Sequence, residues 1–577
     1  MALQQLTTVW GEKITDKPLQ EYPRPQLVRN SYVNLNGWWE YAITKRDDIP
    51  TKFDGKILVP FSPETTLSGV NRALKPNEFL YYRTNFSLTK SFVKDVVLLN
   101  FGAVDCICDV YVNKMHLCRH EGGYNAFSVD ITQALAETNE LIVKVRDYTD
   151  TKYYANGKQS LKRGGMWYTP QSGIWQTVWL ESVPAQYIQG LRITPNIDDA
   201  SVTVEAMTNF DEPVTVKVLD GDKEIVRADG KGAIKLIFPN EAFRLWSPED
   251  PFLYDLKIIS RRDAVKSYFG MRKFACEKVG RYHRLMLNNA PYFHNGLLDQ
   301  GYYSDGLYTA PSDEALAFDI KAMKDLGFNM LRKHIKVEPM RWYYHCDRLG
   351  MLVWQDMPSG GTKQHKWVTL ILPNIGVNRL KDSNYAMFSR KSEQGRDTFV
   401  AEYTEMLDQL YNCVSIAMWV PFNEAWGQFD ANKIAALTRD IDPTRTVDHA
   451  SGWHDQGGGD INSMHVYFKK VHLNKDKNRA VCLTEFGGYS YKDTAHSFNP
   501  DRTFSYKRFD SLDAFNDGIY QLYQRDVINW IDKGLSAAVY TQVSDVEDEV
   551  NGLYTYDRKV LKADPDMIRE LNKKIKL

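Results

Sequence analysis

The hydrophobic pattern of the chain changes near residue 278. Before that point, short segments such as 96–101 and 108–113 alternate Val, Tyr and Phe with polar residues, and helical periodicity is scarce. A period of two is typical of strands with one buried face. The pattern predicts an all-β sandwich for residues 1–185 and a second β-rich part for 186–277. In the second part, Asp220-Gly221 after the stretch 214–219 indicates a hairpin, and its small size suits an immunoglobulin-like sandwich.

After residue 278, apolar runs of strand length alternate with amphipathic segments of helix length, which indicates a parallel sheet. Eight strand candidates occur, at 292–297, 329–333, 351–355, 416–420, 446–451, 461–467, 481–485 and 537–542. Helix candidates occur at 313–327, 338–349, 397–410, 430–441 and 512–532, the first of them preceded by Ser312 as an N-cap. Eight strands in roughly 300 residues fit a (β/α)8 TIM barrel over 278–577, with its active site at the carboxyl ends of the strands.

The fourth and seventh predicted strands each deliver a glutamate to that end of the barrel. Glu424 follows the apolar run 416–420, and Glu485 closes the run 481–485. Glycoside hydrolysis is typically catalysed by two carboxyl groups that face each other across the scissile bond. Apolar neighbours such as Trp426 favour a raised pKa and an acid role for Glu424. We therefore expect Glu424 to be the acid/base and Glu485 the nucleophile, against the alternative that both are solvated loop residues.

Polar side chains near these glutamates are candidates for binding a sugar. Asn423 could bind a hydroxyl or cap a turn, and His334, after the second strand, could bind a hydroxyl or pack in the core. Tyr467 ends the sixth strand and could donate a hydrogen bond to the nucleophile. His465, two residues earlier on the same strand face, competes for that role.

Two acidic and two aromatic side chains complete the candidate site. Asp299 and Asp356 follow the first and third strands, where each could form hydrogen bonds to sugar hydroxyls or a structural salt bridge. Trp453 could stack on a sugar ring, and Trp426 lies close to Glu424 in the sequence. We include both tryptophans among the expected substrate-binding residues.

The composition of the chain limits the classes of binding partner and the cellular compartment that we expect. Lys and Arg number 72 against 73 Asp and Glu, a formal charge of -1, so no electrostatic feature predicts binding to nucleic acid or to an anionic membrane. No stretch of about 20 apolar residues indicates a membrane span, and the N-terminus lacks the pattern of a signal peptide. The seven scattered cysteines favour a reducing compartment. A cytoplasmic location is expected, or a periplasmic or secreted one if a signal peptide has been removed.

Sequence signatures of metal or phosphate sites are missing. No His-Glu-x-x-His, Gly-x-x-x-x-Gly-Lys-Ser/Thr or Gly-x-Ser-x-Gly segment occurs. Cys106 and Cys108 form a Cys-x-Cys pair without a second pair at zinc spacing, so we expect buried small side chains rather than metal ligands. We expect no cofactor and a carbohydrate as the partner, while association into homo-oligomers is left open.

Ordered segments along almost the whole chain resemble glycoside hydrolase family 2, the family of β-galactosidases, β-glucuronidases and β-mannosidases. Segments 35–38 and 172–180 look like the sugar-binding jelly roll of that family, and 245–254 and 269–273 look like the close of its immunoglobulin-like domain. Phe422-Asn423-Glu424 matches its acid/base motif, and the segment 484–487, Thr-Glu-Phe-Gly, matches its nucleophile motif. The resemblance implies a retaining mechanism through a glycosyl bond to Glu485, with carboxyl groups about 5 to 5.5 Å apart.

Departures from the family affect the expected substrate. Only His334 matches the Ser-His-Tyr-Pro segment of many family galactosidases, and 354–361 replaces the metal-coordinating segment of the large ones, so no required metal is expected. The Asn-x-Lys element by which family glucuronidases hold the sugar carboxylate is not evident, and the segment 541–549 is acidic instead. An acidic rim disfavours an anionic sugar.

We therefore expect exo-acting cleavage of a terminal neutral sugar. A β-galactoside ranks first, ahead of a β-mannoside, an arabinoside or a furanoside, and a β-glucuronide ranks low. A non-catalytic carbohydrate-binding protein is an alternative of a different class, and a transglycosylase, which would pass the sugar to another hydroxyl group, is a third.

Overall fold

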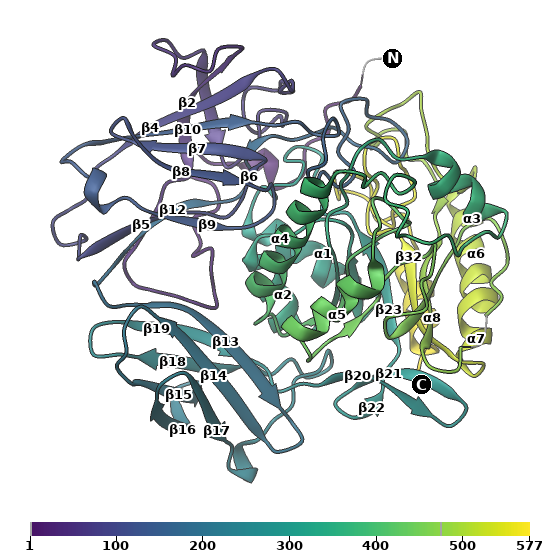
Figure 1. Ribbon diagram of the computed structural model, residues 1–577. Helices are drawn as coiled ribbons and strands as arrows, with labels where there is room; N and C mark the ends of the chain where they lie inside the picture. Colours follow the sequence, from purple (N-terminus) through teal and green to yellow (C-terminus); the bar gives the residue numbers. More distant parts are fainter. Residues whose placement is uncertain (1–2, 474–475) are drawn as a thin grey trace.

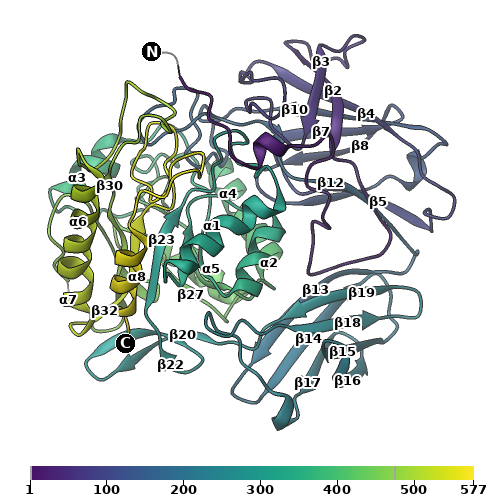
Figure 2. The same ribbon diagram turned by 180° about the vertical axis from the view of Figure 1, so that it is seen from behind.

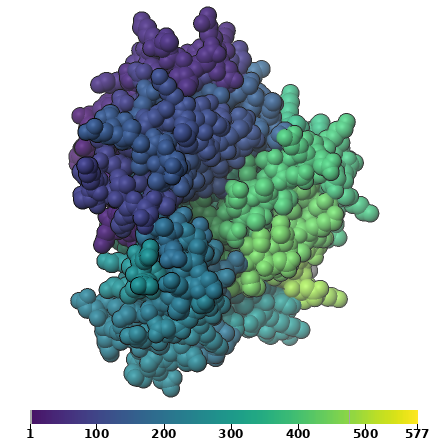
Figure 3. Space-filling model, turned by 60° about the vertical axis from the view of Figure 1, so that its left-hand side comes forward, coloured from purple at the N-terminus to yellow at the C-terminus, as the bar shows by residue number. Residues whose placement is uncertain are grey.

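The computed structural model describes residues 3–473 and 476–577. The predicted ranges 1–185 and 278–577 include the four remaining residues, which lie outside the described part. Two β-sandwiches lie one above the other on one side of the molecule, and the C-terminal barrel lies beside them (Figures 1 and 2). In the space-filling view of Figure 3 the first sandwich, the second sandwich and the barrel pack directly against one another.

The first sandwich packs a six-stranded antiparallel sheet, ordered β3-β2-β4-β10-β7-β8, against a four-stranded one, ordered β1-β12-β5-β9. Inward side chains such as Trp39, Tyr82 and Leu180 form one core between them, as the alternating pattern predicts. The strands are β1 (Tyr32–Asn34), β2 (Gly37–Thr44), β3 (Gly55–Val59), β4 (Phe79–Phe86), β5 (Val96–Phe101), β7 (Ile107–Val112), β8 (Met115–Glu121), β9 (Phe127–Asp130), β10 (Asn139–Arg146) and β12 (Val178–Val183), with a separate pair formed by β6 (Val104–Asp105) and β11 (Gly173–Ile174).

The second sandwich consists of a three-stranded sheet, β13-β14-β17, and a four-stranded sheet, β16-β15-β18-β19. The hairpin expected at Asp220-Gly221 is confirmed, because Asp220 at the end of β15 pairs with Lys223 at the start of β16. Gly221 has a φ of +58° there, which a turn of this kind requires. The strands are β13 (Ile188–Asn196), β14 (Ser201–Thr208), β15 (Val214–Asp220), β16 (Lys223–Gly230), β17 (Ala233–Ile237), β18 (Tyr254–Ile259) and β19 (Ala264–Phe269).

A short antiparallel meander lies at the lower end of the barrel in Figure 1, and the sequence pattern did not predict it. It is formed by β20 (Phe274–Val279), β21 (Tyr282–Leu287) and β22 (Ala290–Pro291). Tyr292, expected in the first barrel strand, instead donates its backbone N–H to Leu285 O in this meander. The first barrel strand begins two residues later, at His294.

The barrel has eight strands joined in parallel pairs, in the order β27-β26-β25-β24-β23-β32-β29-β28. Within the described residues β27 and β28 are not paired with each other, so the barrel is nearly closed. Its strands are β23 (His294–Asp299), β24 (Met330–Lys333), β25 (Leu352–Asp356), β26 (Ile416–Val420), β27 (Thr446–Val447), β28 (Ile461–Val466), β29 (Ala480–Gly487) and β32 (Leu535–Thr541). The predicted fold class, two sandwiches followed by a TIM barrel, is confirmed.

Helices cover the outside of the barrel, and local capping explains where they begin. Ser312 Oγ accepts the Ala315 N–H at 3.2 Å at the start of α1. Ser392 Oγ accepts the Gly395 N–H at 3.1 Å, so α4 begins four residues before the predicted Asp397. The helices are α1 (Asp313–Asp325), α2 (Met340–Leu349), α3 (Leu372–Asn374), α4 (Glu393–Leu410), α5 (Ala431–Ile441), α6 (Leu512–Tyr523), α7 (Asn529–Ile531) and α8 (Pro565–Lys573). None of the helices in the described residues has the length and apolar character needed to cross a membrane.

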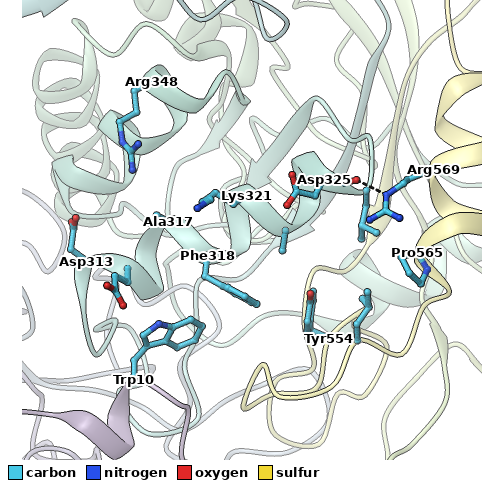
Figure 4. Close-up of a pocket in the computed structure, with 14 residues that line it drawn as sticks. Trp10, Asp313, Ala317, Phe318, Lys321, Asp325, Arg348, Tyr554, Pro565 and Arg569 are labelled. Atoms are coloured by element: carbon cyan, nitrogen blue, oxygen red, sulfur yellow. Dashed lines mark hydrogen bonds between the residues drawn. The ribbon is translucent and has the colours of Figure 1, made fainter.

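A cavity of about 630 Å³ lies on the side of the barrel, between α1, α8 and the N-terminal segment (Figure 4). Trp10 and Phe318 meet edge to face there, with ring centroids 4.9 Å apart. None of the residues that the sequence pattern assigned to the active site lines this cavity. The candidate site is therefore defined by the strand ends.

Candidate functional site

The two predicted glutamates come together at the carboxyl end of the barrel. One oxygen of Glu424, one of Glu485 and a ring nitrogen of His465 all lie within 4.8 Å of one another. The glutamates are 5% and 4% exposed. The strand order explains this meeting: β26 and β29 lie in different parts of one parallel sheet whose carboxyl ends converge.

A strained turn after β26 aims Glu424 at the site. Glu424 and Ala425 have φ values of +47° and +61°, a left-handed conformation that costs a non-glycine residue roughly 1–2 kcal/mol. The turn is fixed because Glu424 N–H donates to Ser451 O at 3.0 Å and Trp426 N–H donates to Asn423 O at 2.9 Å. Backbone strain of this kind persists where surrounding interactions hold the residue in place, and it is often found at functional sites.

The surroundings of Glu424 favour its protonated form. Burial raises the pKa of its carboxyl group, the hydrogen bond to His465 opposes the rise, and the nearby charge of Glu485 adds to it, so that the net pKa shift is upward. His465 Nδ1 lies 2.9 Å from Glu424 Oε1. A protonated, held carboxyl group is what a general acid needs.

Glu485 has the opposite electrostatic setting. Burial alone would raise its pKa, but His465, Arg332 and His334 and a hydrogen bond from Tyr467 together lower the pKa of Glu485 below its ordinary value. Arg332 Nη1 donates to Glu485 Oε1 at 3.0 Å, and the Tyr467 hydroxyl donates to Oε2. Glu485 is therefore held as a carboxylate, the form a nucleophile requires.

Arg332 is the central site residue that sequence reasoning did not single out. Its side chain is fully buried and donates to both oxygens of Asp356 at 3.0 Å and to Asn423 Oδ1 at 2.9 Å, in addition to Glu485. The available signal was a charged residue inside an apolar barrel strand, Met330–Lys333. Such a residue is almost never fully buried without a partner.

The two aspartates of the predicted set are occupied by protein groups. Asp356 accepts from Arg332 and lies 2.9 Å from His334 Nδ1. Asp299 accepts from Lys333 Nζ at 2.7 Å and from the Gly301 N–H at 2.9 Å. For both aspartates the structure favours the salt-bridge interpretation over direct contact with a hydroxyl.

His334 is buried at the same strand ends, and the pKa of its imidazole lies well below the ordinary value because of burial and the nearby charge of Lys158. Burial therefore disfavours the charged form of His334, whose Nδ1 contacts Asp356. Asn423 uses Oδ1 to accept from Arg332, while its Nδ2 is buried without a partner among the described residues. An unpaired buried donor is costly, so Asn423 Nδ2 is available for a substrate oxygen.

His465 and Tyr467 were expected to compete for one role, and the structure gives each its own. His465 contacts Glu424 and lies 3.5 Å from Glu485 Oε2. Tyr467 donates to Glu485, and its ring stacks on Tyr506 with centroids 3.7 Å apart. The two residues thus link both glutamates into one network.

Each of the two predicted tryptophans lies near a histidine of the site. Trp453 is half-buried, with its ring 6.2 Å from that of His465. Trp426 is buried, 5.2 Å from the ring of Trp167 and 6.4 Å from that of His334. Trp167 belongs to the first sandwich and was not predicted, because no pattern along the chain relates it to the barrel.

A segment of the first sandwich, residues 153–169, packs across the strand ends of the barrel; we call it the capping loop. Asn156 and Gly157 donate their N–H groups to Ser359 O at 2.9 Å each, after β25. Arg163 lies 3.3 Å from Glu547 and 3.2 Å from Asp548, after β32. The capping loop therefore joins two barrel loops and brings side chains of the first sandwich to the site.

The acidic segment after β32, expected from the sequence to form an acidic rim, is packed against the capping loop. Glu547, Asp548 and Glu549 are all buried. Arg163 pairs with the first two, and Glu549 accepts from the Tyr168 hydroxyl and lies 3.9 Å from Lys158 Nζ. Three carboxylates thus face two cations of the capping loop, so the segment is acidic but buried and partly neutralised.

Two groups of described residues have spacings that a metal ion could use, Glu424-His465-Glu485 and Asp105-Cys106-Asp147. In the first group Arg332 already neutralises Glu485, so a cation does not fit well. In the second, Asp147 accepts from Thr149 and Ser172 and Asp105 accepts from Gln159. Protein donors already occupy both carboxylates of this group.

Family comparisons cover each part of the chain. Residues 71–172 match the model described as the galactose-binding domain-like part of glycosyl hydrolase 2, residues 186–272 match glycosyl hydrolases family 2, and residues 309–560 match the TIM barrel domain of that family.

Two curated relatives and two solved structures illustrate the similarity. A "Putative beta-glucuronidase" of Formosa agariphila is 27% identical over 367 residues, which is 60% of this chain and 40% of the relative. A "Beta-galactosidase" of Photobacterium profundum is 24% identical over 494 residues, 79% of this chain and 43% of the relative. The chain thus spans about two fifths of the length of these relatives.

Among solved structures, a beta-glucuronidase of an uncultured Clostridium sp. aligns with a TM-score of 0.74 at 16% identity, over 96% of this chain and all of that one. A beta-D-glucuronidase of Dictyoglomus thermophilum aligns with a TM-score of 0.73 at 17% identity, over 96% of this chain and 98% of that one. These likenesses concern the fold. With three matched domain models in the order of the three observed parts, the chain belongs to glycoside hydrolase family 2.

Proposed function

We propose that the protein is a retaining, exo-acting β-glycosidase that removes a terminal neutral sugar from an oligosaccharide or glycoside. The observation that carries this proposal is the pair Glu424 and Glu485, whose nearest oxygens lie within 4.8 Å while their pKa values shift in opposite directions. Retaining glycosidases have carboxyl groups about 5 to 5.5 Å apart, and inverting ones about 6.5 to 9.5 Å. A short separation fits an enzyme whose carboxylate attacks the sugar directly, without a water molecule between them.

In the first step, Glu485 attacks the anomeric carbon while Glu424 gives its proton to the departing glycosidic oxygen. Forming the ester removes the negative charge of Glu485. Since that charge helps to raise the pKa of Glu424, the pKa of Glu424 falls in the intermediate. Glu424 then becomes the base that takes a proton from water, and the water releases the sugar from Glu485.

Neighbouring donors support Glu485 in both steps. Arg332 and the Tyr467 hydroxyl hold one oxygen each in the free enzyme, which fixes the carboxylate and stabilises it again as a leaving group. Asn423 Nδ2, unpaired and buried, supplies a donor for a sugar hydroxyl. Fixed donors aimed at a reacting group lower its barrier because they need no reorganisation.

The preference for a neutral sugar, with β-galactosides first, rests on the charges after β32. Glu547, Asp548 and Glu549 outnumber Arg163 and Lys158, so a sugar carboxylate would enter a region with an excess of negative charge. Names among the relatives include both beta-galactosidase and beta-glucuronidase. Glucuronides are therefore the competing substrates to be measured.

The test is turnover of a panel of nitrophenyl β-galactoside, β-mannoside, arabinoside, furanoside and β-glucuronide substrates by wild type and Glu485→Gln. We expect wild type to cleave a neutral glycoside best with retention of anomeric configuration, and Glu485→Gln to be inactive. Preferred cleavage of the glucuronide would contradict the neutral-sugar assignment.

Other outcomes of this panel separate the alternatives. Sugar binding without any cleavage would indicate a carbohydrate-binding protein. Product analysis at high acceptor concentration distinguishes hydrolysis from transfer, because a transglycosylase passes the sugar to the added hydroxyl group.

A further inference from the structure

Lys158 of the capping loop has a charge without a direct hydrogen-bond partner. The residue is 4% exposed, and its nearest charged group, Glu549 Oε2, lies 3.9 Å from Nζ. Within the described residues the ammonium group makes no direct hydrogen bond, although it carries three N–H donors. Its N–H groups can therefore donate to the oxygen atoms of a ligand.

Glu549 is held in place independently of Lys158. The Tyr168 hydroxyl donates to its Oε2, and Asn551 Nδ2 donates to its Oε1 at 3.1 Å. Each carboxylate oxygen can accept more than one hydrogen bond, so Glu549 keeps acceptor capacity beside the Lys158 ammonium. Lys158 and Glu549 together present a donor and an acceptor a few ångströms apart.

The backbone places Lys158 next to the reaction centre. A Cβ atom at the preceding residue, Gly157, would lie 2.9 Å from Ile335 O, one residue after His334. The charge of Lys158 also contributes a downward shift to the pKa of His334 and to that of Glu424, although the net shift of Glu424 is upward. The ammonium therefore lies within electrostatic reach of the general acid.

We infer that Lys158 and Glu549 bind one hydroxyl group of the terminal sugar. Lys158 donates a hydrogen bond to the hydroxyl oxygen, and Glu549 accepts a hydrogen bond from the hydroxyl group. This inference rests on the proposed function and assigns to the first sandwich a residue that selects the substrate. A hydroxyl both donates and accepts, so it satisfies the two side chains at once. A sugar carboxylate could satisfy Lys158 alone and would be repelled by Glu549.

The experiment measures affinity and turnover in the full-length chain for Lys158→Met, which keeps the apolar stem, and Lys158→Arg, which keeps the charge. Lys162→Met is the matched control, because Lys162 lies on the same loop but is exposed. The affinities of galactose, mannose and arabinose are measured by calorimetry, and then those of the monodeoxy forms of the best ligand. Turnover uses the corresponding nitrophenyl glycosides.

We expect Lys158→Met to weaken binding of the best sugar and to lower kcat/KM by on the order of 10- to 100-fold, the range of a hydrogen bond to a charged group. Lys158→Arg should recover part of the loss, and Lys162→Met should match wild type. For one deoxy sugar the effect of Lys158→Met should vanish, since the contacted hydroxyl is already missing.

Several results would overturn the inference. One is an equal loss for every deoxy sugar, and another is no loss in Lys158→Met. A third is tighter binding of glucuronate or galacturonate that disappears in Lys158→Met, which would assign Lys158 to a carboxylate. If sugar binding depends on Lys158 but no glycoside is cleaved, the proposed hydrolase activity fails while this inference stands.

Discussion

At the scale of single residues, the site depends on two chemically identical side chains held in opposite states. Glu424 is buried against the charge of Glu485, which raises its pKa, while cations and a phenol lower the pKa of Glu485 despite its burial. Environments that push two pKa values apart assign the acid and the base. This division of roles leads to two predictions.

Glu424→Gln should lose activity in proportion to how much the leaving group needs a proton. Glycosides with a nitrophenol leaving group, which departs as an anion, should lose far less in the glycosylation step than alkyl glycosides, which should lose on the order of 10²–10⁴-fold. Pre-steady-state and steady-state kinetics on a series of aglycones measure this dependence. Equal losses across the series would contradict the acid role.

Tyr467→Phe should move the acid side of the pH profile. Activity requires ionised Glu485 and protonated Glu424, so kcat/KM rises as pH increases through the Glu485 pKa and falls as pH increases through the Glu424 pKa. Removing the Tyr467 hydroxyl removes a hydrogen bond that lowers the Glu485 pKa, so the acid limb should move to higher pH. Tyr520→Phe, an exchange on helix α6, is the control and should leave the profile unchanged.

At the scale of elements, Arg332 joins four strand ends of the barrel. It lies on β24 and contacts Asp356 of β25, Asn423 after β26 and Glu485 of β29. The sequence predicted each of these strands, and β26 matches its predicted range, Ile416–Val420. No periodic pattern identifies which side chain will bridge them, because contacts across a barrel interior depend on the register of the strands.

Arg332→Met should destabilise the protein by about 3–5 kcal/mol, since removing one partner leaves buried carboxylates unpaired. Denaturant unfolding measures the change. Arg439→Met breaks a partly exposed pair with Asp460 and should cost at most about 1 kcal/mol. A similar small effect for both variants would contradict a structural role for Arg332.

Three of the described elements were missed by the sequence pattern, each for its own reason. The meander β20–β22 has short strands whose pattern merges with the next apolar run, so Tyr292 was assigned to the barrel. The segment Trp367–Ile371 is π-helical, and a search at 3.6 residues per turn does not find that geometry. The second π-helical segment, Gln524–Ile528, lies within the predicted helix 512–532. Helix α8 is capped by Asp564 with Pro565 at its first turn, a local signal that was present and overlooked.

At the scale of the whole molecule, the first sandwich takes part in the site through the capping loop. Gly157 has a φ of +56°, and a Cβ there would lie 2.9 Å from both Ile335 O and the Tyr308 hydroxyl. Only a glycine fits where the loop backbone meets the barrel. The docking of the loop is therefore sensitive to a single methyl group.

Gly157→Ala should lower kcat/KM by on the order of 10-fold because the loop must move away from the strand ends. Gly221→Ala is the matched control: Gly221 has a similar φ of +58° with nothing within 4 Å, so it shares the backbone strain but not the contact. Both variants should lose about 1–2 kcal/mol of stability, measured by unfolding. Unchanged kinetics in Gly157→Ala would show that loop docking does not affect the site.

The sequence by itself determined the three-part fold and the position of Glu424 and Glu485, because periodicity fixes where strands end and parallel strands end together. It also carried the family motifs around both glutamates. Only the tertiary structure decided which charges surround them. Arg332 comes from β24, Lys158 and Trp167 from the capping loop, and Glu549 from the segment after β32. Asp299 and Asp356 proved to be engaged by Lys333 and Arg332. Contacts between distant segments depend on tertiary packing, and the hydrophobic periodicity of the sequence does not indicate which distant residues will meet.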